Sequence, residues 1–414
     1  MDVLHERCAG LDISKKDAKV CVRTPSARRR GTFTTETTTW GATTNAVLEL
    51  RDHLLAAQVT PVVMEATSDY WKPFHHLLAE DLNVILVNAR QAKNLPGRKT
   101  DVSDAAWLAQ LGAHGLLKAS FVPPQPVREL RDLTRARTVA TRERSRVVQR
   151  LEKLLEDTGI KLSAVAADIM GVSGRAMLEA LIAGERDPQV LAELAKRKLR
   201  NKIPALTEAL TGRFREHHAF LTRLHLDQYD QLTAVIEQLT GRIEEAMAPF
   251  RDALDLLDTV PGINQAIAEV IVAETGGDMS RFPTAKHLAS WAGVRPGHHQ
   301  SAGRTKNSKV RPGNPYLKGA LGLAAMGAAR TKDSYLAARY KRLTARRGVM
   351  KALVAVEHSI ITAIWHMLTD TRPYHELGGA YFTQRDPERT ARRAITQLNQ
   401  LGYSVTLNPI EAAA

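Results

Sequence analysis

Short apolar segments alternate with helical segments along the first 118 residues, and this alternation constrains the fold more than any other feature. Three strand-like segments, CAGLDI, DAKVCVRT and RGTFTT, come first and are rich in Val, Ile, Cys or Thr. A helical segment over 44–56 then precedes the strand PVVMEA, a helix over 70–82 precedes the strand NVILVN, and a last helix begins at Asp101–Asp104. This order predicts a mixed sheet that is covered by helices.

The order β-β-β-α-β-α-β-α matches the ribonuclease H-like fold, of which the RuvC nucleases are one branch. In that arrangement the first strand and the PVVMEA strand are neighbours at the centre of the sheet, and the last helix crosses beside their ends. We therefore expect an α/β, RuvC-like N-terminal domain over residues 1–118.

Four acidic residues lie where these elements would meet: Asp12 in GLDIS, Glu65 at the end of PVVMEA, and Asp101 and Asp104 at the start of the last helix. Taken singly, each of the first two has a structural alternative: Asp12 as a turn or strand-end residue, and Glu65 as a helix N-cap contact. The spacing of three brings Asp101 and Asp104 close together, and the helix dipole offsets only part of their repulsion. Four converging carboxylates destabilise a fold unless divalent cations neutralise them.

Carboxylate oxygens without a cysteine or histidine cluster favour Mg²⁺, or alternatively Mn²⁺, over zinc. Two such ions roughly 4 Å apart can activate the attacking oxygen and stabilise the leaving oxygen in phosphodiester cleavage. The histidine pairs lack metal-ligand spacing, and no P-loop motif indicates ATP hydrolysis. Cys8 and Cys21 exclude a disulfide framework and fit a reducing cytosol.

Positive charge is concentrated in one part of the chain. The formal net charge is +14, and residues 301–351 contain thirteen Lys and Arg against a single acid, Asp333. This concentration indicates a phosphate-binding surface, with a solubility patch as the alternative. There is no signal-peptide core, and no uninterrupted apolar run approaches the roughly 20 residues that span a bilayer, so we expect a soluble cytoplasmic protein without a membrane partner.

Strand signals stop at Pro123, and the rest of the chain has helical patterns. Residues 127–158 form one long helix with eight arginines, and Tyr229–Ala246 carries apolar residues at heptad spacing. These helices would pair as an antiparallel arm within one chain or between chains. We expect a helical, coiled-coil linker and oligomerisation region over 119–255, with an ordinary helical-bundle core as the alternative.

A mainly α C-terminal domain over 256–375 opens with LLDTVPGINQAIAEVIVAET, a helix-hairpin-helix-like pattern. Backbone N–H groups at its Gly262 turn can hold a phosphate, although such turns also join plain helices. Residues 376–414 form a tail.

Three segments of the N-terminal part, EATSDYWKP, NARQAKNLPGRKTDVSDAAWLAQL and HGLLKASFVPP, resemble the DEDD transposases of insertion-sequence family one-ten. That family includes the Piv-like DNA invertases. TVPGINQAIAEVIVAETGGDMSRFPTAKHLASWAGVRPGHHQSAG and KVRPGNPYLKGAL resemble its second conserved domain. The resemblance covers nearly all of 8–118 and 256–375, while the middle helices match only in type. It implies a nuclease domain whose catalytic, metal-binding acids are Asp12, Glu65, Asp101 and Asp104.

The resemblance also implies a catalytic serine in a serine- and glycine-rich loop, and Ser301 in HQSAGR is the matching residue. The family often has two serines followed by two glycines, whereas this chain has Gln300, Ser301, Ala302 and Gly303. A serine hydroxyl can attack a phosphodiester and store its energy as a phosphoserine. The alternative is a polar loop residue beside DNA contacts.

Basic and polar residues near both motifs are the expected nucleic-acid contacts. They are Arg98, Lys99, Gly262, Gly303, Arg304, Lys306, Lys309, Arg311, Asn314 and Lys318. The implied partners are double-stranded DNA at element ends and target, a structured guide RNA, and further copies of the chain in a dimer or tetramer. The implied location is the bacterial cytoplasm, at the nucleoid during activity.

The expected function is thus a metal-dependent DNA transposase or site-specific recombinase that excises and inserts a mobile element, with a structured guide RNA that selects the site by base pairing. One alternative is a RuvC-like junction-resolving endonuclease, which uses water and does not need Ser301. Another is a non-catalytic nucleic-acid-binding protein on a decayed scaffold, against which the presence of all four acids argues.

Overall fold

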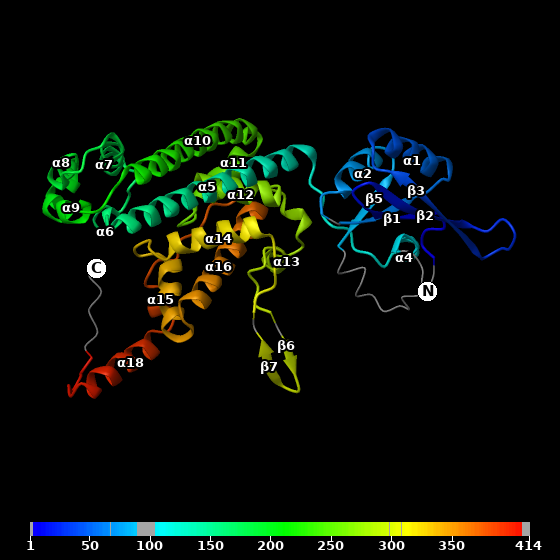
Figure 1. Ribbon diagram of the computed structural model, residues 1–414. Helices are drawn as coiled ribbons and strands as arrows, with labels where there is room; N and C mark the ends of the chain where they lie inside the picture. Colours follow the sequence, from blue (N-terminus) through cyan, green and yellow to red (C-terminus); the bar gives the residue numbers. More distant parts are fainter. Residues whose placement is uncertain (1–2, 67, 89–103, 298, 308, 408–414) are drawn as a thin grey trace. The chain divides into compact units, whose positions relative to one another are not determined.

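The computed structural model describes residues 3–66, 68–88, 104–297, 299–307 and 309–407, and for 299–301 and 305–307 it describes the backbone alone. The chain divides into two compact units, Met1–Pro123 and Pro124–Ala414, whose elements are labelled in Figure 1.

The N-terminal unit contains a mixed five-stranded sheet with the strand order β3-β2-β1-β4-β5. Strands β1, β2 and β3 are antiparallel neighbours, whereas β4 pairs in parallel with both β1 and β5. The expected mixed sheet and the adjacency of the first strand to the PVVMEA strand are therefore confirmed. The strands are β1 (Cys8–Ile13), β2 (Asp17–Pro25), β3 (Phe33–Gly41), β4 (Pro61–Glu65) and β5 (Asn83–Val87).

The third strand begins and ends later than the segment RGTFTT predicts. The reason is a turn at its start, where Ser26 N–H donates to the carbonyl of Thr32 and Gly31 adopts a φ of +78°. Since Arg30 and Gly31 belong to this turn, β3 starts at Phe33 and continues along a threonine-rich edge strand.

Helices cover both faces of the sheet (Figure 1). Helices α1 (Thr44–Ala56) and α2 (Trp71–Leu78) pack on the face that carries Leu11, Val20 and Met64. Helix α4 (Asp104–Ala113) packs on the other face, against Cys8, Val63 and Val87. Because successive side chains along a strand point to opposite faces, β1, β4 and β5 supply residues to both cores.

The C-terminal unit contains two long helices, α5 (Gln125–Thr158) and α10 (Glu216–Ala246), which run antiparallel along each other in Figure 1. They pair within one chain, which is one of the two arrangements that the sequence allows. The segment that joins them in the sequence folds into short helices, which pack around a second hydrophobic core. These are α6 (Leu162–Val165), α7 (Val172–Ala183), α8 (Pro188–Glu193), η1 (Arg197–Lys202) and α9 (Ile203–Leu210).

Among the described residues that remain, the regular structure is helical apart from one β-hairpin. Its elements are η2 (Ala248–Phe250), α11 (Arg251–Asp258), α12 (Gln265–Thr275), η3 (Met279–Arg281), α13 (Ala285–Trp291), β6 (His299–Ser301), β7 (Arg304–Asn307), α14 (Pro315–Ala328), α15 (Tyr335–Arg347), α16 (Val349–Asp370), α17 (Tyr381–Gln384) and α18 (Pro387–Gln400). Among the described residues, α16 is long and apolar enough to cross a membrane. Its Val356, Ile360 and Ile364 are fully buried, however, in the core with α13 and α14, so it serves as a core helix here.

Helices α11 and α12 follow one another across a tight turn, as the helix-hairpin-helix pattern predicts. Gly262 in this turn has a φ of +89°, and a Cβ atom there would overlap the backbone of Ala324 and Ala328 in α14. Glycine is therefore required both for its conformation and for the close approach of α14. This packing role was not expected of Gly262.

Candidate functional site

Asp12 and Glu65 lie side by side at the ends of two neighbouring parallel strands. The register pairs Gly10 with Val63 and Leu11 with Met64, so the next position brings Asp12 beside Glu65. Alternate residues of a strand share a face, and both carboxylates therefore lie on the face that carries Gly10 and Val63. Both residues are partly buried.

Helix α4 packs against this same face of the sheet. A Cβ atom at Gly10 would overlap the carbonyl oxygen of Ala105 and the backbone nitrogen of Ala109, so the helix backbone rests directly on β1. At the other end of α4, a Cβ atom at Gly112 would lie 2.9 Å from Cys8 Sγ. The helix therefore runs antiparallel to β1 and begins near the strand end that carries Asp12.

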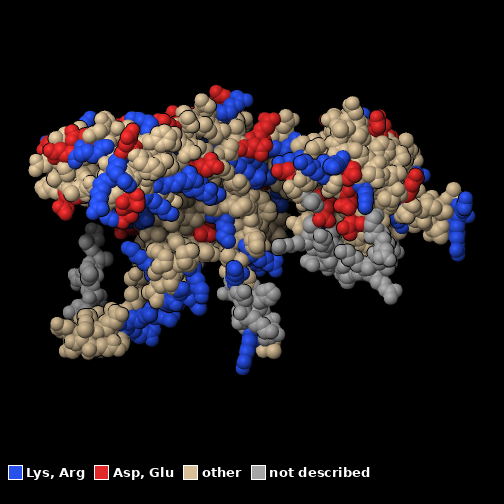
Figure 2. All heavy atoms as spheres, in the orientation of Figure 1, with Lys and Arg blue, Asp and Glu red and all other residues tan. Residues whose placement is uncertain are grey.

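Asp104 is the first residue of α4, directly before Ala105, and is exposed. The fold thus brings Asp12, Glu65 and Asp104 to one edge of the sheet, and Figure 2 shows a group of acidic side chains on this side of the unit. Asp101, Arg98 and Lys99 lie outside the described residues. Within the described ranges, no three His, Cys, Asp or Glu side chains are grouped closely enough to hold a metal ion.

Lys19 is a cation beside this edge that the sequence analysis missed. The antiparallel register places it opposite Asp12, on β2, and cross-strand partners project from the same face. It is exposed, so its ammonium group lies on the same surface as the Asp12 carboxylate. The sequence could have shown this, because the short turn between the first two strands fixes their register and so places Lys19 opposite Asp12.

Ser301 ends strand β6 of a two-stranded hairpin and pairs with Arg304 of β7. The two residues between them, Ala302 and Gly303, have φ angles of +49° and +74°. Tight two-residue hairpin turns of this type need positive φ at both central positions. Gly303 adopts this conformation freely, whereas Ala302 holds it against the steric cost of its Cβ atom.

Glycines also fix the base of this hairpin. A Cβ atom at Gly297, before β6, would overlap the carbonyl oxygen of Lys309, after β7. A Cβ atom at Gly313 would likewise overlap the backbone of Ala292 and Gly293. The two segments that lead into and out of the hairpin are thus in backbone contact, which anchors it at the end of α13.

Arg304, Lys309 and Arg311 are exposed, and Figure 2 shows Lys and Arg side chains over α15 and at the tip and base of the hairpin, whose other atoms are grey. Only the backbone of Lys306 is described. Lys318 differs, because it is half-buried and lies close enough to Glu357 to act on its carboxylate. Burial raises the pKa of the Glu357 carboxyl, and the Lys318 charge partly offsets this rise.

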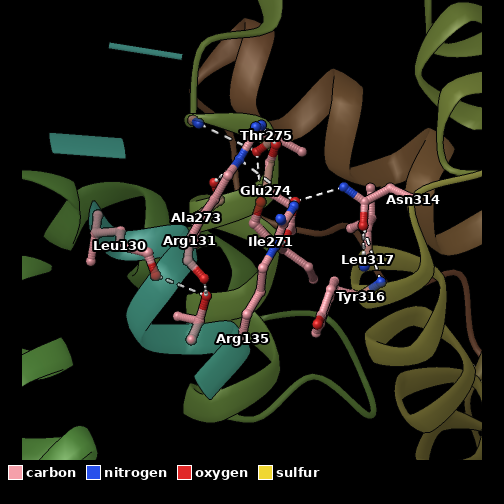
Figure 3. A network of polar contacts seen from close by, with 12 residues as sticks. Leu130, Arg131, Arg135, Ile271, Ala273, Glu274, Thr275, Asn314, Tyr316 and Leu317 are labelled. Atoms are coloured by element: carbon pink, nitrogen blue, oxygen red, sulfur yellow. Dashed lines mark hydrogen bonds and ion pairs between the residues drawn. The ribbon is translucent and has the colours of Figure 1, made fainter. Parts of the chain in front are cut away.

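Asn314 is engaged inside the protein. Its Oδ1 accepts hydrogen bonds from the backbone N–H groups of Tyr316 (3.0 Å) and Leu317 (3.1 Å), which caps α14. Its Nδ2 donates to Oε2 of Glu274 at 2.6 Å (Figure 3). The side chain therefore has a structural role that its interpretation as a nucleic-acid contact did not include.

Arginines of the long helix α5 are also used within the unit. Glu274 of α12 is fully buried and accepts two hydrogen bonds from Arg135, at 2.7 and 2.8 Å (Figure 3). Five residues earlier in α12, Glu269 forms an ion pair with Arg137 at 2.6 Å. These pairs join α5 to α12, so the eight arginines of α5 do not all face an external partner.

Two family models match the chain. One, described as "Transposase", matches residues 9–160, and the other, described as "Transposase IS116/IS110/IS902 family", matches residues 254–341. Together they span more than half of the chain. The first contains all four predicted acids, and the second contains Ser301.

Three similar proteins come from mobile elements or a DNA-inversion system. The insertion element IS116 uncharacterized 44.8 kDa protein of Streptomyces clavuligerus is 27% identical, over 72% of this chain and 79% of its own. The insertion element IS900 uncharacterized 42 kDa protein of Mycobacterium paratuberculosis is 28% identical, over 67% and 73%. The pilin gene-inverting protein of Moraxella bovis is 25% identical, over 88% and 96%. With both conserved regions matched in their expected order, the chain belongs to the IS116/IS110/IS902 family of transposases.

Proposed function

We propose that this protein is a metal-dependent DNA transposase or site-specific recombinase, which cleaves and transfers DNA strands to excise and insert a mobile element. The observation that carries the proposal is the strand register that sets Asp12 beside Glu65, under the end of α4 that begins with Asp104. Family membership supports DNA as the substrate. The likeness to a pilin gene-inverting protein supports inversion as a related outcome.

Asp12, Glu65, Asp101 and Asp104 would hold Mg²⁺ or Mn²⁺ in a RuvC-like domain. The donor set fits these hard cations, because it consists of carboxylate oxygens without a histidine or cysteine among them. Divalent ions bound there would stabilise negative charge on the attacking and leaving oxygens of a phosphodiester. Lys19 adds a positive charge on the same face, where it would hold a neighbouring DNA phosphate.

Ser301 would act as the nucleophile of strand exchange. Its Oγ forms a bond to phosphorus, the bond to one DNA oxygen breaks, and that oxygen leaves with the serine proton. A hydroxyl of a second strand then displaces the serine from the phosphoserine and returns a proton to it. Support comes from the hairpin, which places Ser301 next to a tight turn with Arg304 as its cross-strand partner.

Target selection would use a structured RNA, in which base pairing reads the sequence and the basic protein surface holds the backbone. We further propose that two or four copies assemble through the α5–α10 pair. Val139 of α5 and Val235 of α10 are 41% and 43% exposed, and they offer apolar area for a contact between copies.

Strand cleavage and exchange on DNA that contains the element ends test this function. Asp12→Asn is expected to stop all DNA processing and to keep DNA binding, while Asp52→Asn, on the exposed side of α1, is the matched control. Ser301→Ala is expected to stop strand exchange. A water-using junction endonuclease would continue to cut with Ser301→Ala, and a non-catalytic binder would process no DNA even in its wild-type form.

A further inference from the structure

A cleft of about 840 Å³ opens beside the base of the serine hairpin. Its walls come from the segment before β6, at Val294 and Pro296, and from the segment after β7, at Lys309 and Val310. Helices α15 and α16 complete it. The backbone contacts that anchor the hairpin therefore also shape the cleft.

Four cationic side chains line the cleft: Lys309, Arg339, Arg347 and Lys351. None of the described residues that line it is acidic. The Nε atom of Arg339 is buried and has no hydrogen-bond partner among the described residues. Four cations without an acid among the described lining residues make the cleft suited to an anion.

The pKa of His358, which also lines the cleft, reflects its burial and the positive charges around it. Burial lowers the pKa of its imidazole, and the nearby charges of Arg339 and Arg295 lower the pKa further. A smaller cavity of about 180 Å³, between Arg295 and Arg311, shares Pro296 with the cleft. The positive surface thus continues from the cleft toward the hairpin base.

The remaining lining is apolar, with Val294, Val310, Val354 and Ala355 in the walls and Met350 at the exposed rim. A phosphate alone gains nothing from such walls, whereas a nucleotide brings a flat apolar base together with its phosphate. The volume lies within the usual range for small-ligand pockets. In a duplex the base faces are covered by stacking, so a base must be unpaired to enter.

We propose that this cleft binds one unpaired nucleotide of the DNA strand that lies along the serine hairpin, with its base against the apolar walls and its phosphate among the four cations. This assignment rests on the proposed function, because it takes DNA as the substrate. By holding one nucleotide, the cleft fixes the position of the strand relative to Ser301.

The test measures binding of the full-length protein, in EDTA, to a DNA duplex with one unpaired 2-aminopurine and to the same duplex fully paired. The unpaired duplex is expected to bind about tenfold more tightly, with a change in 2-aminopurine fluorescence. Ala355→Trp, which fills the cleft, and Arg339→Gln and Lys351→Gln, which remove charge, are expected to abolish the preference. Lys341→Gln is the matched control, because it removes an exposed charge of α15 outside the cleft.

Equal binding of both duplexes by the wild-type protein, or a preference that survives in folded Arg339→Gln and Lys351→Gln variants, overturns the proposal. A preference for an unpaired base in an RNA duplex and none in DNA overturns the assignment to DNA. If the wild-type protein cleaves element ends normally but does not prefer the unpaired duplex, the assignment of the cleft is wrong and the proposed function stands. If the wild-type protein prefers the unpaired duplex but does not cleave element ends, the proposed function is wrong and the assignment of the cleft stands.

Discussion

Gly10 of β1 and Ala105 of α4 approach so closely that a Cβ atom on Gly10 would overlap the Ala105 carbonyl oxygen. Leu108 Cβ lies only 3.0 Å from the same position. This contact sets the helix on the sheet face that carries Asp12 and Glu65, and it thereby determines where Asp104 lies.

Gly10→Ala is therefore expected to push α4 away from the sheet. Overpacking of this kind lowers the free energy of unfolding by about 1–3 kcal/mol, and the displaced acids should no longer support DNA processing. Urea unfolding and strand cleavage measure the two effects. Gly241→Ala is the matched control in α10, where no described atom outside the helix would contact the new methyl group. A fully active and stable Gly10→Ala protein would show that the approach is not close.

Ala302→Gly is expected to stabilise the serine hairpin, because glycine adopts the φ of +49° that strains alanine. A left-handed conformation costs an L-residue about 1–2 kcal/mol. Hydrogen exchange of the amides in 299–307 should slow in Ala302→Gly and quicken in Gly303→Ala. Unchanged exchange in both variants would rule out the tight turn.

Glu274→Ala is expected to leave Arg135 without its bidentate partner. It also removes the hydrogen bond from Asn314, so the polar contacts that join α12 to α5 and to the start of α14 are lost. Loss of one partner of a buried ion pair costs about 3–5 kcal/mol, and the partial exposure of Arg135 places the expected loss near the lower end. Thermal and urea unfolding check it. Glu237→Ala on exposed α10 surface serves as control, and an equal effect of both changes would exclude a special role for Glu274.

Glu357 should make stability depend on pH. Burial raises the pKa of its carboxyl above the ordinary value of 4.5, and its Oε2 has no hydrogen-bond partner among the described residues. Because the folded pKa is raised, the stabilising contribution is fully present below the unfolded pKa and is lost as the pH rises through the folded pKa.

Glu357→Gln is consequently expected to be more stable than the wild-type protein at pH 7.5, and the difference should vanish near about pH 4. Urea unfolding of both proteins at several pH values gives this comparison. A constant difference across the range would mean that ionisation of Glu357 does not limit stability.

The sheet and the neighbouring positions of Asp12 and Glu65 could be predicted, because strand alternation indicates which strands are neighbours and which side chains share a face. The β6–β7 hairpin was missed, since HQS and RTKN are short, polar and without apolar alternation. The roles of Arg135 and Arg137 depend on α12, which is distant in the sequence. The cleft was hidden for the same reason, because Lys309, Arg339 and Lys351 meet only in the folded chain.

Binding of Mn²⁺, followed by electron paramagnetic resonance of the full-length protein, tests most directly whether the acids form one cation site. Wild-type protein is expected to bind Mn²⁺, and Asp12→Asn and Glu65→Gln should each weaken binding at least about tenfold, with Asp52→Asn unchanged. Binding by Asp12→Asn and Glu65→Gln that equals the wild-type protein would contradict the shared site.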